Sequence, residues 1–297
     1  MIRIENVIKR KVQQGQKLLP NIKNIILVAS GKGGVGKSTV TANLAVCFAK
    51  MGAKVGILDA DIYGPSQPTL LNLKQNPQTT DKKKIIPLER YGVKMISIGN
   101  LIDPESAVIW RGPIVSRALM QLLNDTDWGH IDYLFLDLPP GTGDIQLTIS
   151  KNMPVTGAVI VTTPQDLSLI DAKRAIAMFQ KVDIKTLGVV ENMSYYICPK
   201  CGNSEHIFGK DGTHLLCSKN NIEFLGNLPL HKDIRENADN GKPYVSLDKD
   251  DSINISYITL AENTLNEIEK LPKASSLDSI GVKYRKLRDQ NRDDKIR

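Results

Sequence analysis

Short apolar runs alternate with segments of helical periodicity along most of the chain. The runs are apolar throughout rather than at every second position, which is typical of strands buried on both faces of a parallel sheet. They predict strands at residues 25–30, 54–59, 93–98, 133–137, 157–162, 186–191 and 222–226. Helices are predicted at residues 36–51, 114–124, 144–150, 166–180, 212–219 and 252–270. The expected fold is a doubly wound α/β domain with a mainly parallel sheet, helices on both faces, and a ligand site at the carboxyl edge of the strands.

Four stretches depart from this alternation. Residues 72–91 are polar and rich in lysine, which predicts a loop or a small hairpin, and residues 195–214 form an insertion between a strand and a helix. In the N-terminal extension, residues 1–20, the pattern predicts a short amphipathic helix from the spacing of Ile4, Val7, Ile8 and Val12. The extension has no continuous apolar run, so it does not resemble a secretory signal. We expect the main domain to span residues 21–272 and a flexible basic tail to occupy residues 273–297.

The composition narrows the class of protein. The chain has 297 residues, of which 41% are hydrophobic and 24% charged, as in ordinary globular proteins. Its apolar runs are far shorter than a membrane span requires, and four cysteines are too few for a disulfide scaffold. A reducing compartment is therefore expected, and we place the protein in the cytoplasm.

The net charge of +7 is concentrated at the two ends of the chain. Residues 1–24 contain six Lys and Arg against one acidic residue, and residues 273–297 contain eight against four. The intervening residues are therefore nearly neutral. Basic tails can contact nucleic acid or anionic lipid, but we expect these to be solvated and not to bind either.

A phosphate-binding loop follows the first predicted strand and opens the first predicted helix. Its sequence fits G-x-x-x-x-G-K-[ST] and comprises Gly31, Lys32, Gly33, Gly34, Val35, Gly36, Lys37, Ser38 and Thr39. Glycines let backbone N–H groups curl around phosphate oxygens, and a helix N-terminus adds partial positive charge. Lys37 is expected to reach the β- and γ-phosphates of ATP, and the Ser38 hydroxyl is expected to bind Mg²⁺.

Aspartates end two of the predicted strands that lie near this loop. Asp59 and Asp61 follow the second strand, and Asp137 ends the strand Leu134–Asp137. Carboxylates at this edge can hold magnesium, directly or through water, and can orient an attacking water. We expect Asp59 to contact Mg²⁺ and Asp137 to hold it through a water. Residues 138–144 combine prolines and glycines, as expected of a segment that a γ-phosphate orders and hydrolysis releases.

The second lysine of the loop points to a particular class of ATPase. Lys32 gives the loop the form G-K-G-G-x-G-K-[ST], which resembles the deviant Walker A motif of MinD/ParA-like P-loop NTPases. The resemblance implies a homodimer that sandwiches nucleotide, in which Lys32 crosses the interface to the partner's nucleotide. It also implies that Asp61 orients the attacking water. A cation delivered in this way stabilises phosphoryl-transfer charge as an arginine finger does.

Longer motifs resemble the Mrp/ApbC iron–sulfur cluster carrier ATPases. They are Asp-Ile-Tyr-Gly-Pro-Ser at residues 61–66, Trp-Arg-Gly-Pro at 110–113 and Asp-Leu-Pro-Pro-Gly-Thr-Gly-Asp at 137–144, and the resemblance spans residues 21–271. It implies that Asn192 contacts adenine, which suits an amide with both a donor and an acceptor, and that Pro229 flanks the base. Many bacterial members have a small domain before the ATPase, whereas about twenty residues precede the first strand here. We therefore expect contacts of that domain to be absent or made by another chain.

A cysteine pair, Cys198-Pro199-Lys200-Cys201, lies in the insertion. Two thiolates supply half of a tetrahedral sulfur site, and a homodimer supplies four. The resemblance implies that Cys198 and Cys201 of two chains bridge one [4Fe–4S] cluster. Three alternatives remain open at this stage: structural zinc with His206, His214 or Cys217 as further ligands, a redox-active pair, or no metal. Thiolates bind zinc well, so zinc is a possible occupant of the isolated protein, whereas Cys47 is expected to be a buried small hydrophobe.

The function implied by these motifs is that of a carrier or scaffold, which binds ATP and hydrolyses it slowly. It would hold a [4Fe–4S] cluster at a homodimer interface, and its partners would be apo iron–sulfur proteins and cluster assembly proteins. The alternative is a MinD/ParA-like positioning ATPase that binds DNA or membrane. The tail has few large apolar residues to bury in a membrane, and that function leaves the cysteine pair without a role. A metabolic P-loop kinase fits less well, because it gives Lys32 no role.

Overall fold

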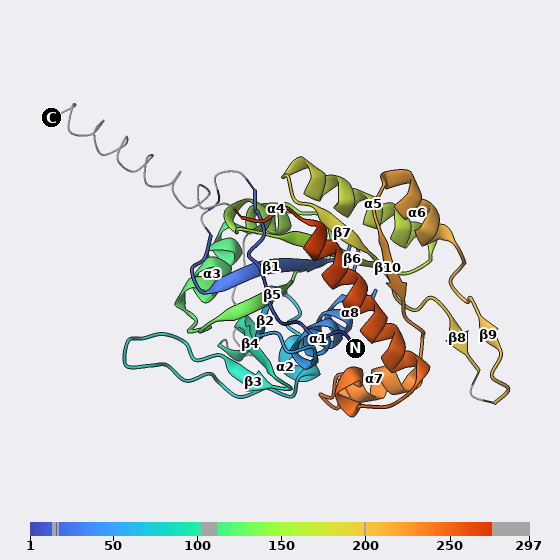
Figure 1. Ribbon diagram of the computed structural model, residues 1–297, viewed down its shortest axis with the longest axis horizontal. Coiled ribbons are helices and arrows are strands. Elements are labelled where there is room, and N and C mark those ends of the chain that lie inside the picture. Colours follow the sequence, from blue (N-terminus) through green and yellow to red (C-terminus); the bar gives the residue numbers. More distant parts are fainter. Residues whose placement is uncertain (14–15, 17, 102–111, 199, 275–297) are drawn as a thin grey trace.

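The computed structural model describes residues 1–13, 16, 18–101, 112–198 and 200–274. In these residues an eight-stranded sheet forms the centre of the molecule, and every neighbouring pair of strands is parallel except β3 with β4 (Figure 1). The spatial order is β10 (Phe224–Asn227), β7 (Thr186–Glu191), β6 (Gly157–Thr162), β1 (Ile22–Ala29), β5 (Ile131–Asp137), β2 (Val55–Asp59), β4 (Val93–Ser97) and β3 (Leu88–Arg90).

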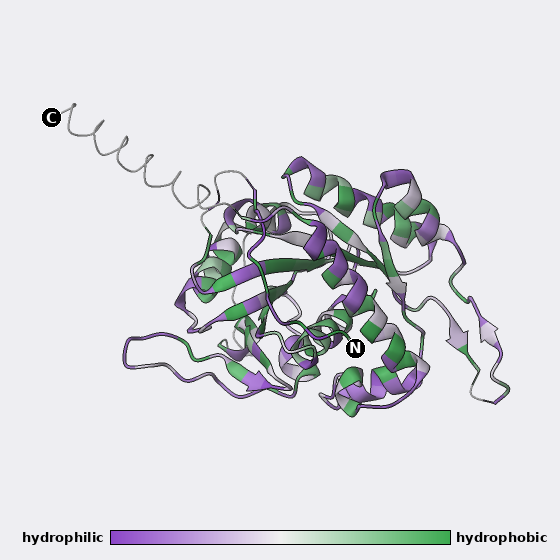
Figure 2. Ribbon diagram, in the orientation of Figure 1, coloured by the Kyte–Doolittle hydropathy of each residue, from purple (hydrophilic) through white to green (hydrophobic). Residues whose placement is uncertain are grey.

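Helices cover both faces of the sheet, as the uniformly apolar strands require. They are α1 (Lys37–Lys50), α2 (Gln67–Leu70), α3 (Gly112–Asp125), α4 (Asp144–Asn152), α5 (Asp166–Lys181), α6 (Gly212–Asn220), α7 (Lys232–Asp239) and α8 (Ser252–Lys270). Ile26 and Val28 of β1 belong to the core cluster formed with α1 and α8, whereas Ile25 and Leu27 belong to the cluster formed with α3 and α5. Alternate side chains of one strand therefore supply the two cores. Figure 2 shows hydrophobic residues along the central strands.

The predicted doubly wound α/β fold is confirmed. Each predicted strand and helix occurs within three residues of its expected ends. Besides the 3₁₀ turns at Ile98–Asn100 and Tyr244–Leu247, four short helices and strands were not predicted: α2, α7, β8 (Tyr196–Ile197) and β9 (Ser204–Glu205). Two of these have two residues and α2 has four, and α7 contains no buried residue, so none has the apolar pattern that prediction relies on.

The stretch 72–91 ends in the hairpin that the sequence allowed. The strands β3 and β4 pair antiparallel, with Arg90 opposite Val93, so only Tyr91 and Gly92 connect them. Both connecting residues have positive φ, 55° for Tyr91 and 74° for Gly92. A two-residue turn with positive φ at both positions matches the right-handed twist of the flanking strands.

The amphipathic helix predicted in the N-terminal extension is wrong. Residues 1–13 form no helix and instead cross the base of the domain. Ile4 donates its N–H to the Met51 carbonyl at 2.7 Å, and the side chains of Ile4 and Val7 pack on the cluster under α1 and α8. An isolated helix of this length is marginal in water, so contacts with the domain decide the conformation.

The extension also pairs with the segment that follows α8. Arg10 forms an antiparallel bridge with Lys273, Lys11 N donates to Pro272 O at 2.8 Å, and Ala274 N donates to Lys9 O at 3.0 Å. Arg10 is only 8% exposed, and its Nη1 donates to the Leu271 carbonyl at 2.9 Å. These contacts form a clasp, residues 9–11 with residues 271–274, at the edge of the sheet where β1 begins.

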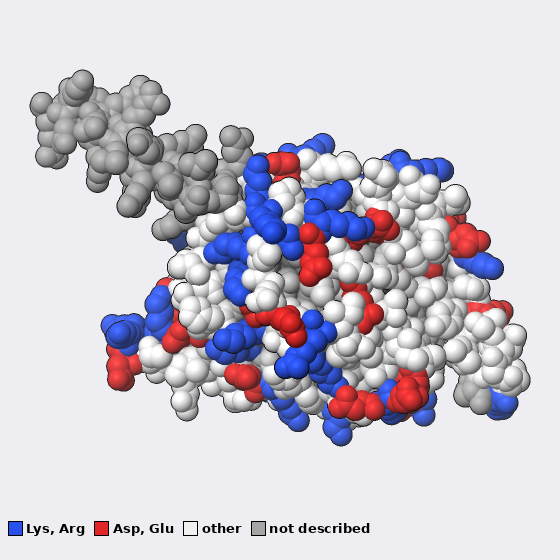
Figure 3. Space-filling model, viewed as in Figure 1, with Lys and Arg blue, Asp and Glu red and all other residues white. Residues whose placement is uncertain are grey.

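Basic and acidic side chains lie next to one another on the face that carries the extension and α8 (Figure 3). Lys23 Nζ lies 2.8 Å from Asp132 Oδ1, and Lys270 pairs with Glu267. This arrangement agrees with the near-neutral charge of the central residues. Among the described residues, no helix is both long and apolar enough to cross a membrane. The basic tail beyond residue 274 and the motif residues Trp110 and Arg111 lie outside the described residues.

Arg10→Ala tests the clasp. We expect the variant to lower the free energy of unfolding by about 1–3 kcal/mol, because it removes a buried side chain and leaves a part-buried carbonyl without its charged donor. Urea denaturation measures this loss. Arg3→Ala is the control, since Arg3 is exposed in the same segment and its loss should change stability by less than about 0.5 kcal/mol. Equal stabilities of the two variants would contradict the contact.

Candidate functional site

The phosphate-binding loop joins β1 to α1 in a conformation that only glycine adopts easily at two positions. Gly34 and Gly36 have φ of 81° and 80°, and Gly36 is the N-cap residue of α1. A Cβ on Gly36 would lie 2.2 Å from Nδ2 of Asn192, so a side chain is excluded there. The first turn of α1 has neither a side-chain cap nor an acidic residue, so its N–H groups suit an anion. The loop therefore fits the phosphates of a nucleotide.

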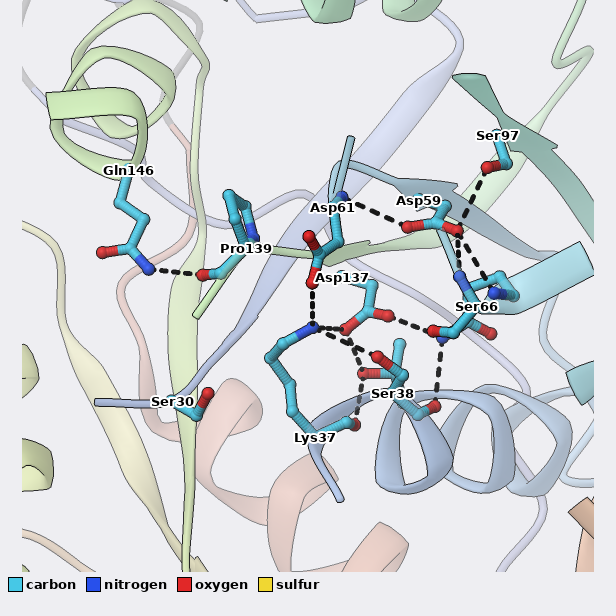
Figure 4. Close-up of polar contacts among 12 residues, drawn as sticks. Ser30, Lys37, Ser38, Asp59, Asp61, Ser66, Ser97, Asp137, Pro139 and Gln146 are labelled. Atoms are coloured by element: carbon cyan, nitrogen blue, oxygen red, sulfur yellow. Dashed lines mark hydrogen bonds and ion pairs between the residues drawn. The ribbon is translucent and has the colours of Figure 1, made fainter. Parts of the chain in front are cut away.

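The lysine of this loop lies among the predicted carboxylates (Figure 4). Lys37 Nζ is 2.5 Å from Asp137 Oδ1 and 3.8 Å from Asp61 Oδ2. Its Nζ also lies 3.2 Å from Ser38 Oγ. Lys37 is 6% exposed and Asp137 is fully buried, so water screens this ion pair weakly. Loop and strand ends meet as expected, since the Ser38 hydroxyl and the carboxylates of Asp61 and Asp137 all surround Lys37 Nζ. Oxygen ligands of these kinds are the ones that Mg²⁺ prefers. Thr39, the last residue of the motif, is half-buried.

Asp59 performs a different task from the other two aspartates. It is fully buried, and Oδ2 accepts the N–H groups of Ser66 and Gln67 and the hydroxyl of Ser97, each at 3.1 Å. Oδ1 accepts the N–H of Asp61 at 3.2 Å. Burial and the nearby charge of Asp137 raise the pKa of Asp59 above its usual range, against these hydrogen bonds. Asp59 thus holds the segment 61–67 in place, and its expected contact with Mg²⁺ stays a prediction.

Two residues that sequence reasoning missed complete the surroundings of Asp137. Gln67, which is fully buried at the start of α2, donates from Nε2 to Asp137 Oδ2 at 2.8 Å and to the Ser38 carbonyl at 3.0 Å. Thr41 donates to Asp137 Oδ1 at 3.2 Å. Thr41 follows Lys37 by one helical turn, and this spacing could have revealed it. Gln67 depends on how the segment 61–67 folds back, which no local pattern indicates.

A cavity of about 390 Å³ opens beside Asp61, between that aspartate and the segment after β5. It is lined by Asp61, Tyr63, Gly64, Pro139, Pro140, Gly143 and Gln146. Gln146 is buried and donates from Nε2 to the Pro139 carbonyl at 2.5 Å, while Gly141 N donates to the Ser30 carbonyl at 2.9 Å. Residues 138–144 therefore touch both the phosphate-binding loop and this cavity. Burial raises the pKa of Asp61, and the charge of Lys37 opposes that shift. A larger hollow, of about 550 Å³, lies between β10 and α8 and has no loop residue in its lining.

The second lysine of the loop turns toward the segment after β6. Lys32 Nζ lies 3.1 Å from Gln165 Oε1, which also accepts the hydroxyl of Thr163 at 3.2 Å. Lys32 is half-buried. The loop 163–165 thus holds this lysine through the Gln165 side chain. Its predicted contact with a partner's nucleotide stays a prediction.

Asn192 and Pro229 lie at the same carboxyl edge, after β7 and β10. Asn192 is 7% exposed, and its Nδ2 donates to the Val35 carbonyl at 2.8 Å. Pro229 is buried between Leu228, whose N–H donates to the Glu191 carbonyl, and Leu230, whose N–H donates to the Tyr195 carbonyl. The fold therefore brings Asn192 into contact with the phosphate-binding loop and places Pro229 beside the end of β7. Their predicted contacts with adenine are not tested by this geometry.

The cysteine pair lies on a hairpin formed by β8 and β9. Cys198 N donates to Asn203 O and Gly202 N donates to Cys198 O, both at 2.9 Å, and Gly202 has φ of 72°. The N–H groups of Cys201 and Lys200, and then the Cys201 side chain, lower the pKa of the Cys198 thiol. Cys201 is exposed. The hairpin thus carries two thiols side by side, one of them with a lowered pKa, and thiols that ionise readily are what a metal-binding pair requires.

The possible third ligands of a zinc site point elsewhere. Cys217 is buried with Sγ 3.7 Å from the Glu223 carbonyl, and the ring of His214 lies 3.9 Å from that of Phe224. Nδ1 of His206 is 2.9 Å from the Ser194 carbonyl. Within the described ranges, no three His, Cys, Asp or Glu side chains are grouped to hold a metal ion. In the described part of the chain, the residues considered as further zinc ligands are therefore not grouped with the cysteine pair.

The remaining cysteine agrees with its prediction. Cys47 is fully buried on α1, and burial raises the pKa of its thiol to about 12. Its Sγ lies 3.7 Å from the Tyr257 carbonyl. It is a small core residue, as expected.

The sequence matches, over residues 21–265, the family described as ParA: NUBPL iron-transfer P-loop NTPase. An iron-sulfur cluster carrier protein of Pseudomonas fragi is 53% identical over 245 residues, which cover 82% of this chain and 85% of that protein. The iron-sulfur cluster carrier protein of Escherichia coli K12 is 50% identical over 264 residues, which cover 89% of this chain and 72% of that protein.

Solved structures show the same fold. A nucleotide-binding protein from Archaeoglobus fulgidus, in complex with ADP, superimposes with a TM-score of 0.67 at 39% identity and covers 80% of this chain and 93% of its own. The cell division ATPase MinD of Pyrococcus furiosus has a TM-score of 0.63 at 24% identity, with 82% and 98% covered. At that identity, the second likeness concerns the fold alone.

The environment of the cysteines predicts a difference in reactivity. We expect Cys198 to react with iodoacetamide at a lower pH than an ordinary thiol, because a lowered pKa leaves more thiolate at neutral pH. Cys217 is the internal control, since burial, then the charges of Glu223 and Glu191, raise its pKa to about 11. Peptide mapping by mass spectrometry across a pH series measures both sites in one sample. A Cys198 profile no lower in pH than that of a free thiol would contradict the N–H contacts.

Proposed function

The chain belongs to the family of NUBPL-type iron-transfer P-loop NTPases, and on that premise we propose that it is an ATP-dependent carrier of a [4Fe–4S] cluster. One observation carries the proposal: a phosphate-binding loop with its carboxylates and a two-thiol hairpin rise from the same edge of one sheet. A nucleotide site and half of a sulfur site thus lie on one rigid scaffold. The relatives named iron-sulfur cluster carrier proteins support this function.

The residues around the phosphate-binding loop have complementary parts in phosphoryl transfer. Lys37 binds the β- and γ-phosphates, and N–H groups of the loop cradle them. Ser38 directly, and Asp137 through water, would hold Mg²⁺, which neutralises charge on those oxygens. Asp61 faces the cavity beside the loop and orients the attacking water there. We propose slow hydrolysis, because regulatory ATPases of this kind lack transition-state groups until a partner supplies them.

A second copy of the chain supplies the missing cation in this proposal. Lys32 is half-buried at the mouth of the site and bound to Gln165, a neutral side chain, so moving it away breaks no ion pair with that residue. Delivered across a homodimer interface, its ammonium group stabilises the charge that develops during transfer. Asn192 and Pro229 are proposed to contact the adenine, from the carboxyl edge of β7 and β10.

The cluster is the cargo. A [4Fe–4S] cluster takes four cysteine thiolates, whereas each chain offers two on its hairpin, Cys198 and Cys201. Since no third metal ligand joins them among the described residues, two hairpins from a homodimer would complete the site. The exposed Cys201 and the half-buried Cys198 suit transfer to apo iron–sulfur proteins and receipt from cluster assembly proteins. Reduced thiols require a compartment such as the cytoplasm.

Anaerobic reconstitution with iron and sulfide tests the cargo. We expect about four irons and four sulfides per dimer in the wild type and loss of both in Cys198→Ala, because two of the four ligands disappear. Iron, sulfide and zinc assays with a mass measurement give the stoichiometry. Cys217→Ala removes a thiol that is 3% exposed and should bind the cluster as the wild type does. A wild-type dimer that refuses iron, or holds only zinc, would contradict the proposal and favour a positioning ATPase.

Lys37→Ala tests the nucleotide site separately. Loss of the buried ammonium group should reduce ATP hydrolysis by about 100-fold or more, whereas cluster binding after reconstitution should be unchanged. Phosphate release measures the first property and iron content the second. The matched control is Lys50→Ala, at the other end of α1, where the lysine pairs with Asp248. Wild-type hydrolysis by Lys37→Ala would overturn the assignment of the phosphate-binding loop.

A further inference from the structure

A buried carboxylate sits between the nucleotide site and the cysteine hairpin. Glu191 is the last residue of β7 and is only 4% exposed. Its Oε1 accepts the hydroxyl of Ser194 at 2.5 Å, and its Oε2 accepts the hydroxyl of Thr213. In the described part of the chain no lysine, arginine or histidine pairs with it. Burying a carboxylate costs free energy unless hydrogen bonds replace those that water made to it. The hydroxyls of Ser194 and Thr213 therefore stay where the carboxylate is.

The two hydroxyls belong to opposite stems of the excursion that carries the cysteines. Ser194 precedes β8, Thr213 lies at the start of α6, and the Cys198–Cys201 hairpin lies between them. Thr213 is fully buried, so its hydroxyl has no access to water. One carboxylate therefore holds the chain both where it leaves the domain and where it returns.

Further contacts brace the same base. Ser194 N donates to the Leu228 carbonyl and Leu228 N donates to the Glu191 carbonyl, both at 2.9 Å. Nδ1 of His206, from the returning stem, lies 2.9 Å from the Ser194 carbonyl. The outgoing stem is thus fixed to Glu191 by backbone as well as by side chain. A displacement of Glu191 moves the whole base of the hairpin.

The next residue along the chain contacts the phosphate-binding loop. Asn192 binds the Val35 carbonyl through Nδ2 at 2.8 Å, and the same nitrogen lies where a Cβ of Gly36 would be. Its N–H donates to the Thr162 carbonyl at 2.8 Å, which anchors it to β6. Asn192 therefore contacts the phosphate-binding loop at Val35 and lies against Gly36. Asn192 directly follows Glu191, so a single peptide unit joins this contact to the carboxylate.

We propose that Glu191 is a positioning residue, which couples nucleotide binding at the phosphate-binding loop to the placement of Cys198 and Cys201 by clamping both stems of their hairpin. The inference rests on the proposed function, because the coupling matters only if two hairpins bind one cluster. The placement of the thiols then decides how the two hairpins face that cluster. Glu191 touches neither nucleotide nor cluster. It acts through Ser194 and Thr213 on one side and through Asn192 on the other.

The test compares alkylation of the full-length apoprotein with and without a non-hydrolysable ATP analogue and Mg²⁺. Iodoacetamide labels Cys201, which is exposed, and Cys198, which is half-buried, and mass spectrometry follows both cysteines. Allosteric coupling typically changes an equilibrium by about 5- to 150-fold, so the analogue should change the wild-type rate by about fivefold or more. In Glu191→Gln the change should fall below about twofold, while affinity for the analogue stays within about threefold of wild type.

Variants at Thr213 keep the test decisive if Glu191→Gln folds poorly. Thr213→Val removes the hydroxyl at nearly constant volume and should lose the nucleotide response, whereas Thr213→Ser keeps the hydroxyl and should retain it. Thr264→Val is the matched control, because Thr264 is also fully buried but donates to Leu260 within α8. Thr264→Val should respond to nucleotide as the wild type does. A lost response in Thr213→Val then cannot be explained by the general loss of stability that removing a buried hydroxyl causes.

Two results would overturn the inference: a wild-type response that persists in Glu191→Gln and Thr213→Val, or a wild-type rate that nucleotide leaves unchanged. Neither result bears on whether a cluster binds, since the labelling uses the apoprotein. Failure of the proposed function would show instead as a wild-type protein that takes up no iron and sulfide. The two failures are therefore distinguishable.

Discussion

One buried ammonium group balances the carboxylates at the carboxyl edge of the sheet. Lys37 contacts Asp137 and Asp61 directly, and its charge also lowers the pKa of Asp59, which burial and Asp137 raise. Several negative groups in a low-dielectric site attract a further cation and resist an anion. When phosphates bind Lys37, its ammonium group no longer balances the aspartates, so a second cation must bind with the nucleotide. This arrangement therefore suits a magnesium complex of ATP rather than free ATP.

Strand register accounts for how much of this site the sequence could predict. Asp59 and Asp137 stand opposite each other in the β2–β5 pairing, where each is the last residue of its strand. Adjacent parallel strands bring their carboxyl ends together, so the loop motif and strand ends were enough to gather Lys37, Ser38 and the three aspartates. The structure adds that Asp59 faces backbone N–H groups of residues 61–67. Predicting this contact would have required knowing the path of that segment.

Side-chain contacts that depend on the path of an irregular segment were beyond prediction for a common reason. Gln67 reaches Asp137 only because residues 61–66 fold back, and Glu191 reaches Thr213 only because an excursion of about twenty residues returns to its starting point. The helix prediction for the N-terminal segment was wrong for a different reason. The spacing of its apolar residues fits a helix, but Ile4 and Val7 also pack on the domain when the segment is extended. Periodicity over a dozen residues does not separate these conformations when tertiary contacts decide.

The clasp at the base of the domain has a consequence for the connectivity of the chain. Residues 9–11 and residues 272–274 are hydrogen-bonded neighbours, and they lie where β1 begins, at the opposite edge from the phosphate-binding loop. A short linker could join these two segments without crossing the nucleotide site or the cysteine hairpin. The fold is therefore open to circular permutation, with new ends placed in an exposed loop such as residues 76–84, because the order of the strands in space does not depend on which one the ribosome makes first.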